Sequence, residues 1–425
     1  MCILNIKGEY KLKRLNKFLF VSLFALILFG CSKKTTRDNT TSNTTTNRVL
    51  DKYSITLNNE VEGLTISGVT SGDKYDYNSE ITLTASNIPS GNIIKWSRSD
   101  GVEFIGNTYK FNLPNENITI TTTTLNCYTR EGNKIYFGTY PQTRVTDDTL
   151  VSELNDLAED LPSSDNLYNW TDYNYYLKGN VASYMFYQDI DYDNNGTYDY
   201  RGVYFTAYKP ESHLSNAMTG NQNTNGYSTN TVYWFNYDPI EWNIITESDG
   251  KATLLANLIL DSQEYMTSTS ETKYSHNGGT GYANNYELSN IRKWLNDNFY
   301  NTAFVSYKKL IIQTTTVENG PESMGKTEPN DYTCNNTEDK VFFMSYEEIT
   351  THFTDSAART SGTDYAKCQG LYVNDGYSHY WTRSPYIDYQ PNLTVYYVNG
   401  GNGKCYGVLL YYAYIGVRPT ITIQL

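Results

Sequence analysis

The chain has 425 residues, 39% of them apolar and 19% charged, so it can bury a core large enough for more than one domain. Its formal net charge of −13 argues against nucleic-acid binding, because contacts to a phosphate backbone need clustered Lys and Arg. Tyrosine is unusually frequent, with 42 residues beside 15 Phe and 6 Trp. Because tyrosine suits both half-buried strands and contact surfaces, we expect β-rich structure and a binding surface.

Residues 1–30 have the pattern of a secretory signal. Five basic residues lie before residue 18: Lys7, Lys11, Lys13, Arg14 and Lys17. The apolar run that follows, at 18–29, is short for a membrane span. It ends in Leu-Phe-Gly-Cys, which resembles a bacterial lipobox. The resemblance implies lipidation of Cys31 and a location in the bacterial cell envelope, at an outer surface or in the outer membrane. A non-cleaved anchor helix is the alternative.

Residues 31–50 are nearly free of apolar side chains, so we expect a flexible tether there. A β-rich module should follow at 51–126, where short strands alternate with turns. The stretches EITLTAS, IIKWSRSDG and YKFNLPNENITITT resemble the divergent repeats of the internalin-B type. The resemblance implies a spacer module, in which Trp96 and Phe111 are core aromatics.

A larger domain is expected at 130–425. Helical spacing predicts helices at 148–161 and 289–304, and Ser345 begins a capping box for another helix. Strands are expected at 242–245 and 252–258, which together give an α+β domain. The ordered motifs FGTYPQ, IEW, RKWLN, NTEDKVF, WTRSP and GVRP resemble a bacterial domain family of unknown function. That family brings no established activity.

The two C-terminal motifs, WTRSP and GVRP, resemble the formylglycine-generating-enzyme branch of the C-type lectin fold. The resemblance implies that Trp381, Arg383, Gly416 and Arg418 are structural, with the arginines bonded to backbone carbonyls. It also implies that the stretch between the motifs faces solvent and ligand.

The sequence offers little for catalysis. His213, His276, His352 and His379 show no metal-binding spacing, and no nucleophile elbow is present, so we do not expect an enzyme. A hydrolase that uses distant carboxylates stays open as an alternative.

Cysteine spacing also gives no zinc or redox motif. Four cysteines follow the lipobox, at 127, 334, 368 and 405, and no two of them form a C-x-x-C pair. Outside the cytoplasm they can form disulfides, and we expect Cys334 to pair with Cys368. Buried free thiols are the alternative.

One segment resembles the beginning of a calcium-binding loop. Asp191, Asp193, Asn195 and Asp199 place oxygen ligands around Gly196, where the chain can turn. A plain hairpin turn is the alternative. Calcium is the only cofactor that the sequence suggests.

The stretch between WTRSP and GVRP combines tyrosine with Asn, Asp and Gly, as antibody paratopes do. Its candidate ligand-binding residues are Tyr386, Asp388, Tyr389, Asn392, Asn399, Asn402, Tyr406, Tyr411, Tyr412 and Tyr414. We therefore expect a surface protein, partnered with the membrane through its lipid, that binds a glycan or a protein. A structural envelope lipoprotein without a specific ligand is the alternative, in which these tyrosines only complete strands.

Overall fold

The computed structural model describes residues 51–162, 169–173, 185–215, 217–218, 220–274, 276 and 279–425. The expected signal, its Cys31 and the tether lie outside these residues. In the part of the chain that is described, no helix has the length and apolar character needed to cross a membrane.

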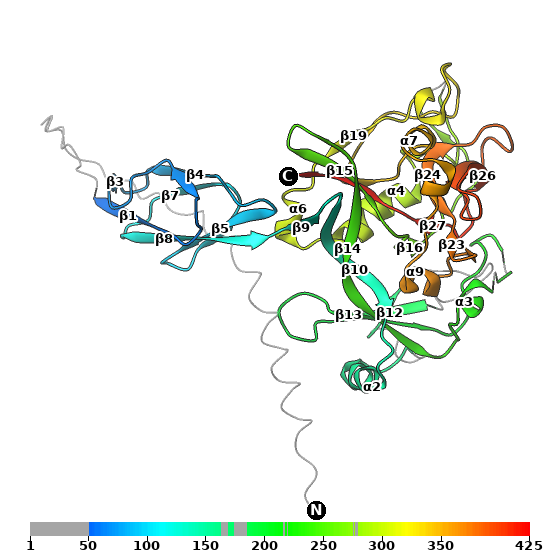
Figure 1. Ribbon diagram of the computed structural model, residues 1–425, viewed down its shortest axis with the longest axis horizontal. Coiled ribbons are helices and arrows are strands. Elements are labelled where there is room, and N and C mark those ends of the chain that lie inside the picture. Colours follow the sequence, from blue (N-terminus) through cyan, green and yellow to red (C-terminus); the bar gives the residue numbers. More distant parts are fainter. Residues whose placement is uncertain are drawn as a thin grey trace, which may run out of the picture. The chain divides into compact units, whose positions relative to one another are not determined.

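Residues 52–126 form two antiparallel-rich sheets around their own core (Figure 1). The first sheet has the order β3-β1-β8-β5-β6 and the second β2-β4-β7. The strands are β1 (Lys52–Asn59), β2 (Thr65–Ser67), β3 (Lys74–Asp76), β4 (Glu80–Ser86), β5 (Asn92–Arg98), β6 (Glu103–Ile105), β7 (Thr108–Asn112) and β8 (Ile118–Asn126). Alternation along β4 buries Ile81 and Leu83, and Trp96 of β5 is fully buried beside them, whereas Phe111 is partly buried.

A nine-stranded sheet forms the main framework of the remaining chain. Its path is β11-β12-β13-β14-β15-β28-β21, and β10 joins β14 to β9. The strands are β9 (Tyr128–Glu131), β10 (Lys134–Arg144), β11 (Thr171–Asp172), β12 (Met185–Ile190), β13 (Tyr200–Phe205), β14 (Val232–Ser248), β15 (Lys251–Ala256), β21 (Val341–Phe342) and β28 (Thr420–Gln424). The last strand of the chain, β28, thus lies inside the sheet between β15 and β21. In Figure 1 it is the red strand at the C-terminus, beside β15. Its Ile421 and Ile423 are fully buried.

A five-stranded sheet carries the two C-terminal motifs. Its order is β16 (Asp261–Ser262), β27 (Gly416–Val417), β24 (Tyr380–Pro385), β25 (Thr394–Val398) and β26 (Cys405–Leu409). WTRSP lies on β24 and GVRP begins on β27, and the two strands pair in parallel at Tyr380 and Gly416. A side chain at Gly416 would lie 2.7 Å from the carbonyl oxygen of His379, so this close pairing requires glycine.

Three short strand pairs complete the β-structure: β17 (Thr272–Lys273) with β18 (Thr280–Gly281), β19 (Thr315–Val317) with β20 (Thr337–Asp339), and β22 (Val373–Asn374) with β23 (Tyr377–Ser378).

The helices are short. They are α2 (Asp148–Leu157), α3 (Asn221–Thr224), α4 (Asn290–Trp294), α5 (Tyr300–Ala303), α6 (Ser306–Lys309), α7 (Tyr346–His352), α8 (Asp355–Ala358) and α9 (Asp364–Cys368), with a π-helical turn η2 (Leu295–Phe299) and a 3-10 turn η3 (Pro321–Met324). The helix expected at 289–304 is present as the continuous run of α4, η2 and α5, capped by Ser289. Ser345 forms the expected capping box of α7 with Glu348.

The fold is therefore mostly β, with several sheets, rather than an even α+β mixture. The 3.6-residue periodicity located true helices, but most of them are a single turn or two, and the predicted helix at 148–161 already ends at Leu157. The expected strand at 242–245 is part of β14, which extends from Val232 to Ser248. More backbone N–H and C=O groups are therefore hydrogen-bonded in paired strands than the sequence pattern indicated.

Candidate functional site

The tyrosine-rich stretch lies on β25, β26 and the loops beside them. Successive residues of β25 point to opposite faces. Tyr396 is buried, with its ring 4.3 Å from that of Tyr346 and 5.0 Å from that of Tyr386. Tyr397, on the other face, pairs across the strands with Tyr406. The stretch is thus part core and part surface.

Aromatic rings on the Tyr397 side form a continuous row. Its members come from β26, β25, the residue between β23 and β24, the loop before β22 and the loop after β26. In order they are Tyr406, Tyr397, His379, Tyr372, Tyr414, Tyr412 and Tyr411, and neighbouring ring centroids are 4.8 to 6.4 Å apart. Such spacing is typical of interacting aromatic pairs.

Hydrogen bonds hold the middle of this row. The Tyr372 backbone N–H donates to the Tyr414 carbonyl at 3.1 Å, which joins two segments far apart in sequence. The Gly400 N–H donates to Nδ1 of His379 at 2.9 Å, and the amide of Asn399 donates to the Tyr397 hydroxyl at 3.2 Å. These bonds fix the backbone segments of Tyr372 and Tyr414 beside each other and give the His379 ring and the Tyr397 hydroxyl one partner each.

A cavity of about 430 Å³ opens along the row. Tyr372, His379, Tyr397 and Tyr414 line it, and we call these four residues, together with Glu211, the aromatic groove. The Ala413 N–H donates to the Glu211 carbonyl at 2.9 Å, which brings the loop of Glu211 to this edge. The groove combines ring faces with a carboxylate acceptor.

His379 is neutral in the groove near neutral pH. Burial lowers the pKa of its imidazole to about 4. Because Nδ1 accepts the Gly400 N–H, the ring proton is carried by Nε2, which makes Nε2 a hydrogen-bond donor. Burial also raises the pKa of the Tyr397 and Tyr414 hydroxyls, so both stay protonated. The groove therefore offers neutral donors beside the Glu211 acceptor.

The ten candidate residues of the stretch do not all meet at this groove. Only Tyr414 lines it, and Tyr411, Tyr412 and Tyr406 extend its row of rings. Tyr411, Tyr412 and Tyr414 are also packed against the main core, so they are only partly exposed to solvent, and ligand binding by them stays a prediction.

The other candidates lie outside the groove. The side chain of Tyr389 is 64% exposed, and a carboxylate oxygen of Asp388 lies 4.0 Å from the Lys326 ammonium nitrogen. Asn392 donates to Glu271, and Asn402 donates to the hydroxyl of Tyr406. Tyr386 packs edge-on against Tyr396, while the amide of Asn399 holds Tyr397.

Four groove residues are not among the ten candidates: Glu211, Tyr372, His379 and Tyr397. Tyr372 and His379 lie just before WTRSP, and the high tyrosine density already begins there. That density was the one available signal. Glu211 reaches the groove from about 200 residues away, and no local pattern marks it.

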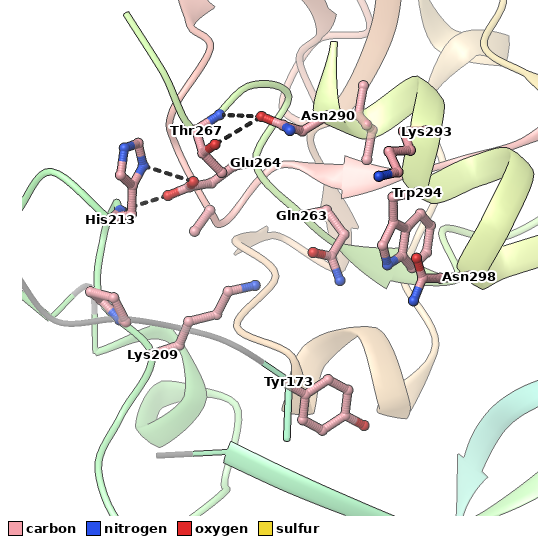
Figure 2. A pocket seen from close by; sticks show the side chains of 13 residues that line it. Tyr173, Lys209, His213, Gln263, Glu264, Thr267, Asn290, Lys293, Trp294 and Asn298 are labelled. Atoms are coloured by element: carbon pink, nitrogen blue, oxygen red, sulfur yellow. Dashed lines mark hydrogen bonds and ion pairs between the residues drawn. The ribbon is translucent and has the colours of Figure 1, made fainter. Parts of the chain in front are cut away.

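A second cavity, of about 460 Å³, lies beside α4 (Figure 2). Trp294 forms one wall, and Nδ1 of His213 lies 2.9 Å from a carboxylate oxygen of Glu264. The ammonium of Lys209 donates to the carbonyls of Ser262, at 2.6 Å, and Gln369, at 3.1 Å. Burial lowers the pKa of this lysine to about 8. Lys209 thus links two backbone segments below the cavity.

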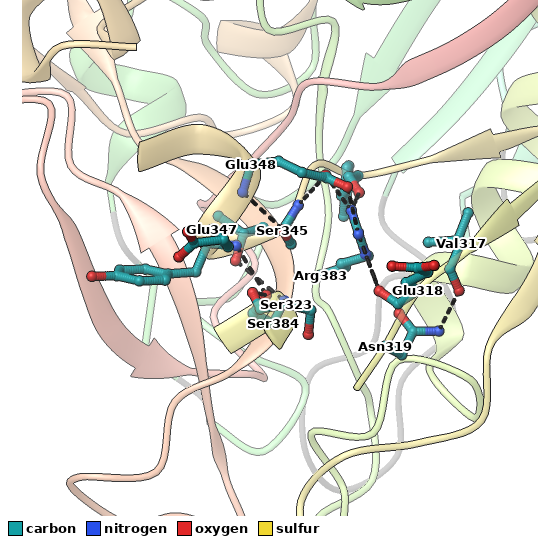
Figure 3. Close-up of polar contacts among 12 residues, drawn as sticks. Val317, Glu318, Asn319, Ser323, Ser345, Glu347, Glu348, Arg383 and Ser384 are labelled. Atoms are coloured by element: carbon teal, nitrogen blue, oxygen red, sulfur yellow. Dashed lines mark hydrogen bonds and ion pairs between the residues drawn. The ribbon is translucent and has the colours of Figure 1, made fainter. Parts of the chain in front are cut away.

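The two motif arginines are structural. Arg383 is buried, and its guanidinium donates to the carbonyls of Phe343 and Glu318 and to both carboxylate oxygens of Glu348 (Figure 3). Arg418 donates to the carbonyls of Ala256 and Ala358 and to the Tyr380 hydroxyl.

Trp381, the other large residue of the first motif, is buried in the core and donates its indole N–H to the Gln263 carbonyl at 2.8 Å. Together with Gly416, it belongs to the framework that supports the tyrosine-rich stretch.

The disulfide expected between Cys334 and Cys368 is absent from the structure. Both thiols are buried and free, as is Cys127, and Cys405 is free and partly buried. Cys334 lies beside Tyr286 and Glu287, whereas Cys368 is on α9 beside Tyr227. Two helices, α7 and α8, lie between them along the chain, and the two thiols have different neighbours in the core. Burial raises the pKa of Cys334 to about 12, so its thiol is unreactive.

The acidic segment predicted for calcium is the turn between β12 and β13. Carboxylate oxygens of Asp191, Asp193 and Asp199 lie within 4.8 Å of one another. The turn is also held by its own backbone, since the N–H of Gly196 donates to Asp191 at 2.9 Å and that of Tyr192 to Asp199 at 2.8 Å. The three carboxylates thus converge as in a calcium loop, while the hydrogen bonds within the segment are those of a plain turn.

Comparison with known proteins gives one match. Residues 249–425 match the model of a family described as a domain of unknown function (DUF6273). No curated protein and no solved structure matches the chain. The family resemblance expected over 130–425 is thus found from β15 to the C-terminus, a part that contains both motif arginines and most of the aromatic groove.

Proposed function

We propose that this chain is a lipid-anchored protein of the bacterial cell envelope that binds a saccharide in the aromatic groove. The observation that carries the proposal is the continuous row of rings along a cavity of about 430 Å³. Tyrosine and histidine rings present flat apolar faces, on which the C–H face of a sugar ring packs. Their polar edges supply hydrogen bonds, and Glu211 adds an acceptor for sugar hydroxyls.

The neutral state of His379 favours an uncharged ligand over an anionic one. With its pKa lowered to about 4, the imidazole brings no positive charge to the groove. Glu211 would also repel a ligand carboxylate or phosphate. A neutral saccharide fits this charge pattern, and a protein ligand is the other class that the tyrosine-rich surface favours.

The anchoring part of the proposal rests on the N-terminal sequence. The basic residues, the apolar run and Cys31 support lipidation, and the polar tether would hold the folded part away from the membrane. The module at 51–126, with its resemblance to internalin-B repeats, would act as a spacer.

We also propose a distant relation between the larger domain and the lectin-like fold. Two observations support this relation. The WTRSP and GVRP strands are adjacent, and the arginine of each motif donates hydrogen bonds to backbone carbonyls.

Calcium binding at the turn after β12 is a second proposal. The three converging carboxylates support it. Chelation should then lower the melting temperature of the full chain, and Asp193→Asn should abolish that difference. If the melting temperature is the same with chelator and with added calcium, the segment is a plain turn.

Saccharide binding is tested by probing a glycan array with the full chain and then measuring affinity by calorimetry. We expect Tyr372→Ala to weaken binding at least tenfold, because it removes a ring at the centre of the row. Tyr389→Ala is the matched control, since Tyr389 is a more exposed tyrosine outside the groove.

Each outcome decides between the alternatives. Binding that is lost in Tyr389→Ala and kept in Tyr372→Ala would move the site to the exposed loop. Binding to host or bacterial proteins alone would favour the protein ligand. An absence of binding to either class would favour the structural envelope lipoprotein.

A further inference from the structure

A third cavity, of about 370 Å³, is distinct from the aromatic groove and has a different chemistry. Four glutamates from three segments line it, and we call it the acidic pocket. Glu318 follows β19, Glu322 lies on η3, and Glu347 and Glu348 lie in the first turn of α7. Figure 3 shows Glu318 and Glu348 beside Arg383, and Glu347 farther along the same helix.

The charge of the acidic pocket is only partly neutralised. Glu348 is paired with Arg383, at 2.7 Å between Oε1 and Nη2. Among the residues that the structure describes, no Lys, Arg or His forms an ion pair with Glu318, Glu322 or Glu347. Arg383 and His352 also line this cavity, but Arg383 is already bound to Glu348. The carboxylates of Glu318, Glu322 and Glu347 therefore leave the pocket with an excess of negative charge, which favours a positively charged ligand.

Two threonine hydroxyls independently indicate a ligand at this place. Thr420, on β28, is fully buried and lines the pocket, and its Oγ1 has no hydrogen-bond partner in the described part of the chain. The same holds for the buried Oγ1 of Thr315 on β19. A buried hydroxyl without a partner is costly, so a ligand that donates hydrogen bonds here would remove that cost.

One part of the pocket wall is apolar. Val317, Phe342 and Met344 line it and are buried in the protein. An aliphatic chain can pack on these side chains while a charged end reaches the carboxylates and hydroxyls, as lysine side chains do elsewhere.

The carboxylates are spread around the pocket instead of converging on one point. In the described residues, the one group of three or more possible metal ligands with mutual distances within 4.8 Å is Asp191, Asp193 and Asp199, which lies elsewhere. A divalent metal needs such convergence. An ammonium group with three N–H donors can instead bond to acceptors spread over several side chains.

We propose that the acidic pocket binds a primary ammonium group carried on an aliphatic stem of about four or five carbons. A free diamine and the lysine side chain of a peptide share this chemistry. The carboxylates of Glu318, Glu322 and Glu347 attract the charge, the hydroxyls of Thr315 and Thr420 accept N–H bonds, and Val317, Phe342 and Met344 contact the stem.

The test is calorimetric titration of the full chain with 1,5-diaminopentane and with Nα-acetyl-lysine N-methylamide. The neutral counterparts are 1-pentanol and the same lysine derivative acetylated at Nε. We expect at least one amine to bind at least tenfold more tightly than its neutral counterpart, and binding to weaken as salt is added. Binding of only the diamine or only the lysine derivative identifies the source of the ammonium group.

Two variants separate binding from folding. Thr420→Val keeps the shape and removes the unpartnered hydroxyl, so it should lower amine affinity about fivefold without lowering the melting temperature. The double variant Glu322→Gln and Glu347→Gln should lower affinity at least tenfold, whereas Glu116→Gln, an exposed control on the module at 51–126, should leave it unchanged. Equal binding of amines and neutral counterparts, no binding at all, or wild-type affinity in both variants would overturn the proposal.

Discussion

The motif strands and the tyrosine-rich stretch between them are adjacent in sequence but differ in how they are held. Arg383 and Arg418 are buried and bonded to carbonyls from segments far along the chain, so each one ties several loops together. The tyrosines between them form ring contacts with one another, several also pack against the main core, and their burial ranges from the core residue Tyr396 to the exposed Tyr389. A residue that lies between the two structural motifs in sequence is therefore not always exposed on the surface.

The largest effect is expected from Arg383→Ala. It would leave two carbonyls and the carboxylate of Glu348 without their partner, at a cost of about 3 to 5 kcal/mol in the free energy of unfolding. Chemical denaturation measures this cost. Arg130→Ala, which removes an exposed pair with Glu247, is the control and should cost far less, because solvent screens this pair. Equal losses in the two variants would contradict the structural role of Arg383.

A smaller loss is expected from Gly416→Ala, because the added Cβ would meet the His379 carbonyl where β24 and β27 pair. Overpacking of this kind costs about 1 to 3 kcal/mol. Gly401→Ala, in the tyrosine-rich stretch, would meet only side-chain ends of Asn374 and Asn399, which can move. Chemical denaturation measures both losses. A larger loss of stability in Gly401→Ala than in Gly416→Ala would contradict this prediction.

Within the stretch itself, Tyr412→Ala and Tyr389→Ala should differ. Tyr412 is partly buried and its ring centroid lies 5.0 Å from that of Tyr414, so its loss should cost about 1 to 2 kcal/mol. Tyr389 is mostly exposed, and its replacement should change stability by about 0.5 kcal/mol or less. Thermal melts measure the two changes. If both variants melt at the same temperature, Tyr412 and Tyr389 are equally exposed, and the predicted difference is wrong.

The smallest effect is expected from His379 and is confined to acidic pH. Burial lowers its pKa from 6.5 to about 4, so the unfolded chain binds the proton more strongly between these values. Stability should therefore fall as the pH falls from 6.5 towards 4. His379→Gln should flatten this part of the curve of melting temperature against pH, while His352→Gln, an exposed control, should not. An unchanged slope in His379→Gln would place the imidazole in water.

Local sequence determined those features that depend on neighbours within one or two turns. Ser345 and Glu348 form their capping box because both partners lie three residues apart. Ser289 begins the helical run for the same reason. The alternating strands at 81–85 and 93–96 and the burial of Trp96 also follow from local patterns. The structural arginines were found through a resemblance of short motifs rather than from spacing.

Tertiary structure decided everything that joins distant residues. Tyr372 meets Tyr414 through a backbone hydrogen bond, and Glu211 joins them from another loop. Thr315 and Thr420 line one pocket from strands over 100 residues apart in sequence. Cys334 and Cys368 are closer in sequence, and yet both thiols are free. Periodicity reports only which face of an element is apolar, whereas strand order and register decide which faces meet, and that choice is made by the packing of the whole chain.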